Sequence, residues 1–161
     1  MKHIESAVKK LVRQKAEFVI IGGVAIIAHG VPHATFDLDF CYARTPKNIK
    51  KIVTALTDFN PRLRGFPNDL PFIWDERSLQ NGTNFTLQTN IGDIDLLGEV
   101  AGVGTYTEVF EHSIKLKLFD FEVNVLSLDD LIKAKKAAGR PKDLLVLPEL
   151  EALQEALSQD E

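Results

Sequence analysis

An apolar segment that runs directly into a pair of glycines is the feature that most constrains the fold of this chain. Residues Phe18–Ile21 are apolar throughout, Gly22 and Gly23 follow at once, and residues 24–29 are mostly small and apolar. This order predicts a buried strand, a tight turn that needs glycine, and a short helix packed back on the sheet. Missing side chains would also let a phosphate approach backbone N–H groups there, but a glycine pair at such a junction more often serves only the turn.

The other apolar patterns predict further helices and strands. Helical spacing predicts a helix that ends near residue 16 and another that starts at Thr45 and Pro46, and Ser127 and Asp130 form a capping box before a later helix. Residues 141–157 are expected to form one or two final helices. Period-two and continuous apolar patterns predict strands over residues 36–42, 85–89, 93–97, 114–118 and 121–126.

This order of elements predicts the fold class. Residues 60–82 show no clear period and are expected to form a loop with one short helix. Helices that alternate irregularly with hairpins favour an α/β (α+β) fold with a mixed β-sheet flanked by helices. We expect a single domain over residues 1–161, with a C-terminal helical segment from about residue 127.

Length and composition exclude several classes of protein. The 161 residues, 45% of them hydrophobic, suit a globular domain that needs no metal to fold, so a metal would serve chemistry. The single cysteine, Cys41, excludes a disulfide within the chain and a cysteine-built zinc site, and favours a reducing, cytoplasmic location. The net charge of -4 argues against extensive nonspecific nucleic-acid binding. No apolar run is long enough to span a membrane, and residues 1–17 are expected to form a helix rather than a targeting segment.

Two carboxylates in the pattern Asp37-Leu38-Asp39 give the sharpest chemical signal. A spacing of two on a strand places both carboxylates on one face, while Leu38 and Phe40 face the core. Carboxylates held in this way repel each other, so they suit either a solvent-exposed strand face or a site for hard cations such as Mg²⁺. For an isolated Asp-x-Asp pattern, the exposed face is the commoner case.

A third carboxylate comes from the following hairpin. Asp93-Ile94-Asp95 repeats the pattern, and Asp95 is the better candidate because Ile94 and Leu96 have the pattern of a buried face while Asp93 lies nearer the turn. Three carboxylates on adjacent strands would form the cage that two-metal phosphoryl transfer requires. One metal would lower the pKa of the attacking hydroxyl, and the other would neutralise the triphosphate and the leaving pyrophosphate.

Together these segments resemble the nucleotidyltransferase superfamily with the polymerase-beta-like fold, and more narrowly its branch of AbiEii-type toxins and related small proteins. The resemblance covers residues 18–150. It is carried by residues 18–25, 29–30, 35–40 and 94–98, and residues 126–143 are similar to the family's C-terminal helical segment.

The resemblance implies roles for these positions. Asp37, Asp39 and Asp95 would be the catalytic residues and would hold two Mg²⁺ ions, with Asp95 helping to activate the incoming hydroxyl. The residues that would bind the NTP are Gly22, Gly23, His33, Thr35, Lys135 and Arg140. For Lys135 and Arg140, together with the neighbouring Lys142 and Asp143, a solvated helix end with basic residues near its C-terminus explains the pattern equally well.

Two positions depart from the family pattern. Gly23 stands where the family usually has serine, which removes a hydroxyl contact with phosphate. His33 stands where members of this branch commonly carry arginine, and histidine carries a full positive charge only when its pKa lies above the ambient pH. Either the triphosphate is held less tightly, or the acceptor differs, or the site has lost its activity.

Two functional hypotheses follow. The first is a Mg²⁺-dependent nucleotidyltransferase that transfers NMP from an NTP to a hydroxyl of a tRNA end, a protein or a small molecule; the resemblance also implies a toxin–antitoxin or phage-defence role, with a cognate antitoxin as partner. The alternative is a catalytically degenerate module of the same fold that binds a protein partner. His33 and the short C-terminal region favour the alternative, and the three aspartates favour the enzyme.

Overall fold

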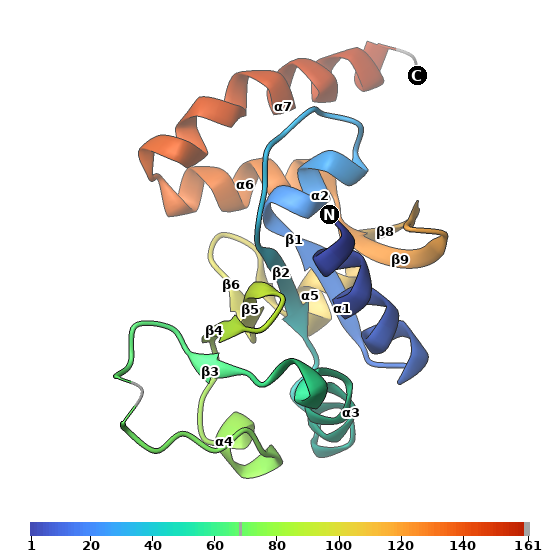
Figure 1. The fold of residues 1–161 in the computed structure, drawn as a ribbon. Helices are drawn as coiled ribbons and strands as arrows, with labels where there is room; N and C mark the ends of the chain where they lie inside the picture. Colours follow the sequence, from blue (N-terminus) through green and yellow to red (C-terminus); the bar gives the residue numbers. More distant parts are fainter. Residues whose placement is uncertain (68, 160–161) are drawn as a thin grey trace.

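The computed structural model describes residues 1–67 and 69–159, and its centre is a mixed β-sheet (Figure 1). The strands of this sheet are β1 (Phe18–Ile21), β2 (Leu38–Tyr42), β3 (Arg62–Leu63), β4 (Phe85–Thr89), β5 (Gly92–Leu97), β8 (Ser113–Leu118) and β9 (Phe121–Leu126). Their order in the seven-stranded sheet is β3-β4-β5-β2-β1-β9-β8. Two short strands, β6 (Glu99–Val100) and β7 (Gly104–Thr105), form a separate ribbon.

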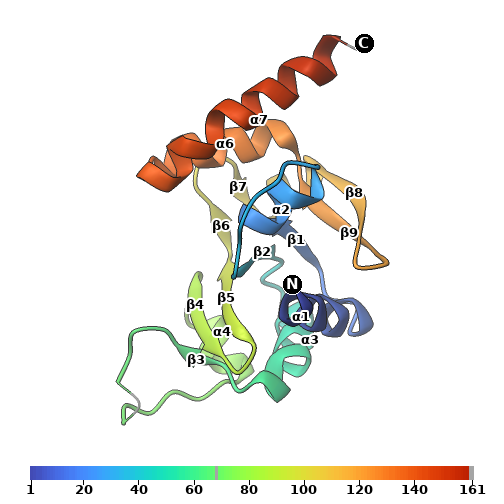
Figure 2. The ribbon, with the colours of Figure 1, turned by 45° about the horizontal axis from the view of Figure 1, so that its top comes forward.

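Helices surround this sheet. They are α1 (Lys2–Arg13), α2 (Gly22–Ala28), α3 (Pro46–Leu56) with the 3₁₀ turn η1 (Thr57–Phe59), α4 (Glu76–Gln80), α5 (Tyr106–Glu111), α6 (Leu128–Ala138) and α7 (Pro141–Gln159). Figures 1 and 2 show α6 and α7 side by side at one end of the molecule, with α3 and α4 at the other. No helix in the described ranges, 1–67 and 69–159, is both long and apolar enough to cross a membrane.

The sheet is mixed because its central strands run in both directions. β1 pairs with β2 antiparallel and with β9 parallel, and β2 pairs with β5 parallel. All four residues of β1 are buried, as expected for a central strand covered on both faces. The predicted α/β fold with a mixed sheet flanked by helices is confirmed.

Local sequence signals account for the start of α3 and for both ends of α6. The side chain of Thr45 accepts a hydrogen bond from the backbone N–H of Asn48, and Pro46 occupies the first turn of α3. The side chain of Ser127 likewise accepts from the N–H of Asp130 at the start of α6, and Gly139 ends that helix with a φ of 64°.

Some expectations were wrong in detail. β2 starts at Leu38, because its pairing with β5 begins there, so Asp37 precedes the strand instead of lying in it. α2 starts at Gly22, so the glycine pair forms the first turn of the helix rather than a separate turn before it. The short elements β3, β6, β7 and α5 were not expected at all. By contrast, the one or two helices expected over residues 141–157 are confirmed as one continuous helix, α7, which contains Pro148.

Candidate active site

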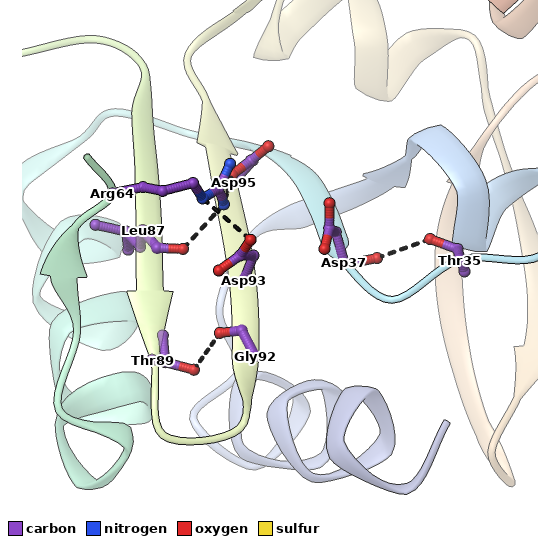
Figure 3. A network of polar contacts seen from close by, with 8 residues as sticks. All are labelled: Thr35, Asp37, Arg64, Leu87, Thr89, Gly92, Asp93 and Asp95. Atoms are coloured by element: carbon purple, nitrogen blue, oxygen red, sulfur yellow. Dashed lines mark hydrogen bonds and ion pairs between the residues drawn. The ribbon is translucent and has the colours of Figure 1, made fainter. Parts of the chain in front are cut away.

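Asp39 and Asp95 lie opposite each other on neighbouring parallel strands. The register of β2 and β5 pairs Asp39 with Asp95 and Leu38 with Ile94. Leu38 and Phe40 are buried, so the alternation along β2 sends Asp39 to the other face, where it is half-buried. Asp37 is half-buried too and lies beside this pair, across β5 from the β4 side (Figure 3). The structure therefore brings the three predicted carboxylates together.

The two glycines make room for side chains of this cluster. Gly22 has a φ of 68°, and a Cβ atom built on it would overlap Oδ2 of Asp39. A Cβ atom on Gly23 would lie 2.7 Å from Oγ1 of Thr35, whose hydroxyl donates to the carbonyl of Asp37 at 3.2 Å. Glycine is required here because Asp39 and Thr35 pack against the first turn of α2.

The carboxylate cluster holds more negative charge than its surroundings balance. Burial, followed by the charge of Asp95, raises the pKa of Asp39 to about 7. Burial also raises the pKa of Asp37, with Asp93 and Asp95 as the next causes. Oδ1 of Asp39 is buried and has no hydrogen-bond partner among residues 1–67 and 69–159. A bound cation would satisfy this oxygen and offset the repulsion.

The residues present therefore fit a divalent metal, although the described residues contain no group of three or more His, Cys, Asp or Glu side chains already arranged to hold one. Carboxylate oxygens are the ligands that Mg²⁺ prefers, and Asp37, Asp39 and Asp95 would supply them. Their role as metal ligands stays a prediction.

The predicted basic residues are tied to a buried carboxylate. Asp143 is fully buried, and its Oδ1 lies 3.2 Å from Nζ of Lys135. Its Oδ2 accepts hydrogen bonds from Nε of Arg140 at 2.7 Å and from the backbone N–H of Arg140 at 3.1 Å. Burial alone would raise the pKa of Asp143, but the hydrogen bonds from Arg140 and Lys135 outweigh it and hold this pKa below its usual value.

This network shows what Lys135 and Arg140 each contact. Lys135 lies in the last turn of α6, as the helix-end interpretation requires. Arg140 lies between α6 and α7, and its side chain turns back to Asp143 in the first turn of α7. The two basic groups are thus fixed in place by Asp143, whose part the sequence did not reveal.

All the predicted site residues line two neighbouring cavities. The first has a volume of about 250 Å³ and the second about 280 Å³, and both are lined by Asp39, Lys135 and Arg140. The first cavity also reaches Gly22 and Asp95. The second also reaches the remaining predicted residues and one further lysine: Gly23, His33, Thr35, Asp37 and Lys142.

A larger cavity lies elsewhere. Its volume is about 400 Å³, and Phe18, Tyr106 and Phe110 contribute to its lining together with residues of β9. None of the three clustered carboxylates lines it, so its size does not make it the candidate active site.

Arg64 is a residue of the site that the sequence did not reveal. It follows β3 directly, and its Nη2 donates to Oδ1 of Asp95 at 2.6 Å and to the carbonyl of Leu87 at 3.0 Å. Its Nε lies 3.2 Å from Oδ2 of Asp93. Figure 3 shows the side chain reaching across β4 to the carboxylates of β5. Residues 62–64 are too few to show the period of a strand, so no local pattern in the sequence marks Arg64.

The described residues thus combine a mixed sheet, carboxylates on adjacent parallel strands and two glycines in the first turn of the neighbouring helix. Residues 1–96 match the family model described as a nucleotidyltransferase of unknown function (DUF6036), and the chain belongs to this family. The matched residues include the glycine pair and all three clustered aspartates, whereas Lys135 and Arg140 lie beyond them.

Comparison with solved structures supports the same fold. The crystal structure of a protein from Thermotoga maritima described as a "putative nucleotidyltransferase" superposes with a TM-score of 0.56. The two sequences are 14% identical, and the alignment covers 94% of this chain and 91% of the other. At this identity the likeness concerns the fold alone. No curated protein sequence matches the chain.

Proposed function

We propose that the chain is a metal-dependent nucleotidyltransferase that transfers NMP from an NTP to a hydroxyl group of an acceptor. The observation that carries this proposal is the alignment of Asp39 with Asp95 on parallel strands, with Asp37 beside them. Membership in a nucleotidyltransferase family supports it.

The reaction forms a bond between the acceptor oxygen and the α-phosphorus of the NTP. The bond from this phosphorus to the oxygen that bridges to the β-phosphate breaks, and pyrophosphate leaves with the electron pair. In this proposal the carboxylate of Asp95 receives the proton of the acceptor hydroxyl. Two Mg²⁺ ions held by Asp37, Asp39 and Asp95 would lower the pKa of that hydroxyl and neutralise the triphosphate.

The other cavity residues would bind and orient the nucleotide. Lys135 and Arg140 offer positive charge to the phosphates, and their bonds to Asp143 hold them in place before the nucleotide arrives. Gly22 lines the first cavity and Gly23 lines the second. His33 and Thr35 line the second cavity together with Asp37, where they would contact the nucleotide.

Nucleotide binding provides the first test. Isothermal titration with ATP, GTP, CTP and UTP, each with and without Mg²⁺, compares the wild type with Asp37→Ala and with the control Asp58→Ala. Asp58 is an exposed carboxylate that pairs with Lys10 outside the cavities. We expect Mg²⁺-dependent binding that Asp37→Ala weakens at least about tenfold, since a charged ligand contact is worth roughly 1.5–3 kcal/mol. Binding that ignores Mg²⁺, or that survives Asp37→Ala unchanged, would contradict the proposal.

A transfer assay tests the reaction itself. Each α-³²P-labelled NTP is incubated with total tRNA, with candidate partner proteins or with small hydroxyl compounds, and label is followed into the acceptor. Transfer by the wild type and by Asp58→Ala, but not by Asp37→Ala, is the expected result. Binding without transfer to any acceptor would favour the alternative, a degenerate module that binds a protein partner. The toxin–antitoxin role and the antitoxin partner stay predictions of the sequence resemblance.

A further inference from the structure

The basic side chains near the carboxylate cluster pair with different carboxylates. Lys135 and Arg140 are both bonded to Asp143. Arg64 pairs with Asp95 and Asp93. The buried Oδ1 of Asp39, by contrast, has no hydrogen-bond partner in the described part of the chain. The basic group in direct contact with a proposed metal ligand is therefore Arg64.

The ion pair of Arg64 with Asp95 is exposed enough to separate when another cation binds Asp95. Its side chain is 33% exposed and that of Asp95 is 23% exposed, so water reaches both groups. Although Nε lies 3.2 Å from Oδ2 of Asp93, its N–H points at no acceptor among the described residues. Ion pairs with this degree of exposure contribute little to stability, about 0.2–1 kcal/mol.

A cation between Asp39 and Asp95 would meet Arg64 at the same carboxylate. Oδ1 of Asp95 already accepts a hydrogen bond from Arg64 at 2.6 Å. A divalent ion and a guanidinium repel each other when they share one carboxylate. Asp93 offers Arg64 a second partner on the same strand, two residues away.

We propose that Arg64 is a displaceable counter-ion, which holds Asp95 when no metal is bound and releases it, keeping Asp93, when a divalent cation binds the aspartates. This inference rests on the proposed function, because it takes Asp37, Asp39 and Asp95 as the metal ligands. Arg64 is then a positioning residue that sets the metal affinity of the nucleotide-free protein, so that metal binds weakly until the nucleotide brings its own phosphate ligands.

Binding of Mn²⁺ alone tests this role. The free ion is measured by electron paramagnetic resonance during titration of the nucleotide-free wild type, Arg64→Gln and the control Arg62→Gln. Arg62 is exposed, lies two residues earlier on β3, and loses the same charge. We expect Arg64→Gln to bind Mn²⁺ about fivefold more tightly, which corresponds to the loss of a competing pair of roughly 1 kcal/mol, and Arg62→Gln to match the wild type. Equal or weaker binding by Arg64→Gln would overturn the proposal.

A measurement on the unaltered protein keeps the test decisive if Arg64→Gln does not fold. The ¹⁵Nε–¹Hε signal of Arg64, assigned by its loss in Arg64→Lys, is followed by NMR during addition of Mg²⁺. Displacement from Asp95 predicts a saturable shift of this signal, while the Arg62 signal stays in place. An Arg64 signal that does not respond at saturating Mg²⁺ overturns the proposal.

Failure of this inference can be told apart from failure of the proposed function. If Asp37→Ala and Asp39→Asn abolish Mn²⁺ binding while Arg64→Gln leaves it unchanged, the metal site stands and only the role of Arg64 is wrong. If the aspartate variants bind Mn²⁺ as the wild type does, the metal site is wrong, and the counter-ion role falls with it.

Discussion

Nζ of Lys135 lies 3.2 Å from Oδ1 of Asp143, a carboxylate with no solvent exposure. This contact joins the last turn of α6 to the first turn of α7, and Arg140 closes the link from the residues between the two helices. A buried carboxylate thus holds both basic groups of the candidate site, so the structure of this end of the molecule and the proposed nucleotide contacts depend on the same residue.

Asp143→Asn should destabilise the protein substantially. The substitution removes the buried charge and leaves Lys135 without its ionic partner; breaking such a pair costs about 3 kcal/mol when one member is fully buried. Urea unfolding measures the free energy. Glu151→Gln on the same helix is the control, because its pair with Lys136 is exposed and should contribute less than about 1 kcal/mol. Equal losses for the two variants would contradict a structural role for Asp143.

The same carboxylate predicts how stability depends on pH. The pKa of Asp143 is lower in the folded protein than its ordinary value of 3.8. The stabilisation is therefore complete above the pKa of the unfolded chain, and it is lost as the pH falls through the lower pKa of the folded state. Free energies of unfolding measured between pH 7 and pH 2 should fall more steeply below about pH 4 for the wild type than for Asp143→Asn. Parallel curves would show that Asp143 does not contribute.

Gly22→Ala should impair both stability and metal binding. The residue has a φ of 68°, and its new methyl group would overlap Oδ2 of Asp39. Gly30→Ala is a matched control, because Gly30 also has a positive φ, 93°, yet a Cβ atom there meets nothing within 4 Å. Both variants should lose about 1–2 kcal/mol from backbone strain, but only Gly22→Ala should displace Asp39 and weaken Mn²⁺ binding. Equal Mn²⁺ affinities would show that Asp39 tolerates the methyl group.

Without metal, replacing the Asp39 carboxylate should stabilise the protein, whereas the loss of a buried polar group usually destabilises it. In EDTA, Asp39→Asn should be more stable than the wild type by about 1–2 kcal/mol, since it removes a buried charge beside Asp95 in the candidate site. Added Mg²⁺ should then stabilise the wild type and leave Asp39→Asn unchanged. Thermal unfolding with and without Mg²⁺ checks both effects, with Asp58→Asn as the exposed control. A less stable Asp39→Asn in EDTA would count against charge repulsion in the cluster.

The carboxylate cluster was predictable because its signals are local. Alternation along residues 38–40 and 93–96 shows which side chains share a face, although Asp37 lies just before β2, and the hairpin of β4 and β5 follows from its tight link. The parallel pairing of β2 with β5 is not local, since it joins strands that are separated by α3 and the least patterned segment of the chain. The chemistry of a metal cage, and then the family resemblance, suggested that Asp95 would lie beside Asp39, but no local pattern predicted this strand pairing.

Arg64 and Asp143 show why other residues of the candidate site could not be predicted from the sequence. Arg64 belongs to a segment whose strand, β3, has two residues, too few for a period to appear. Its partner Asp95 lies 31 residues further along the chain, so no spacing rule connects them. For Asp143 the sequence left a contact with nucleotide and a solvated helix end equally open, since a lone charged residue carries no signal that it is buried. The missed helix α5 did carry a signal, the capping box of Thr105 and Glu108.

The wall that the two cavities share has a consequence for ligand design. Because Asp39, Lys135 and Arg140 line both cavities, small fragments that bind separately in each would lie on either side of the same few side chains. A short linker around these side chains would join two weakly binding fragments into one bivalent ligand. Its second contact would form at the high effective concentration that the linker sets. The gain in affinity on linking would then measure how rigidly Asp143 holds the side chains of Lys135 and Arg140.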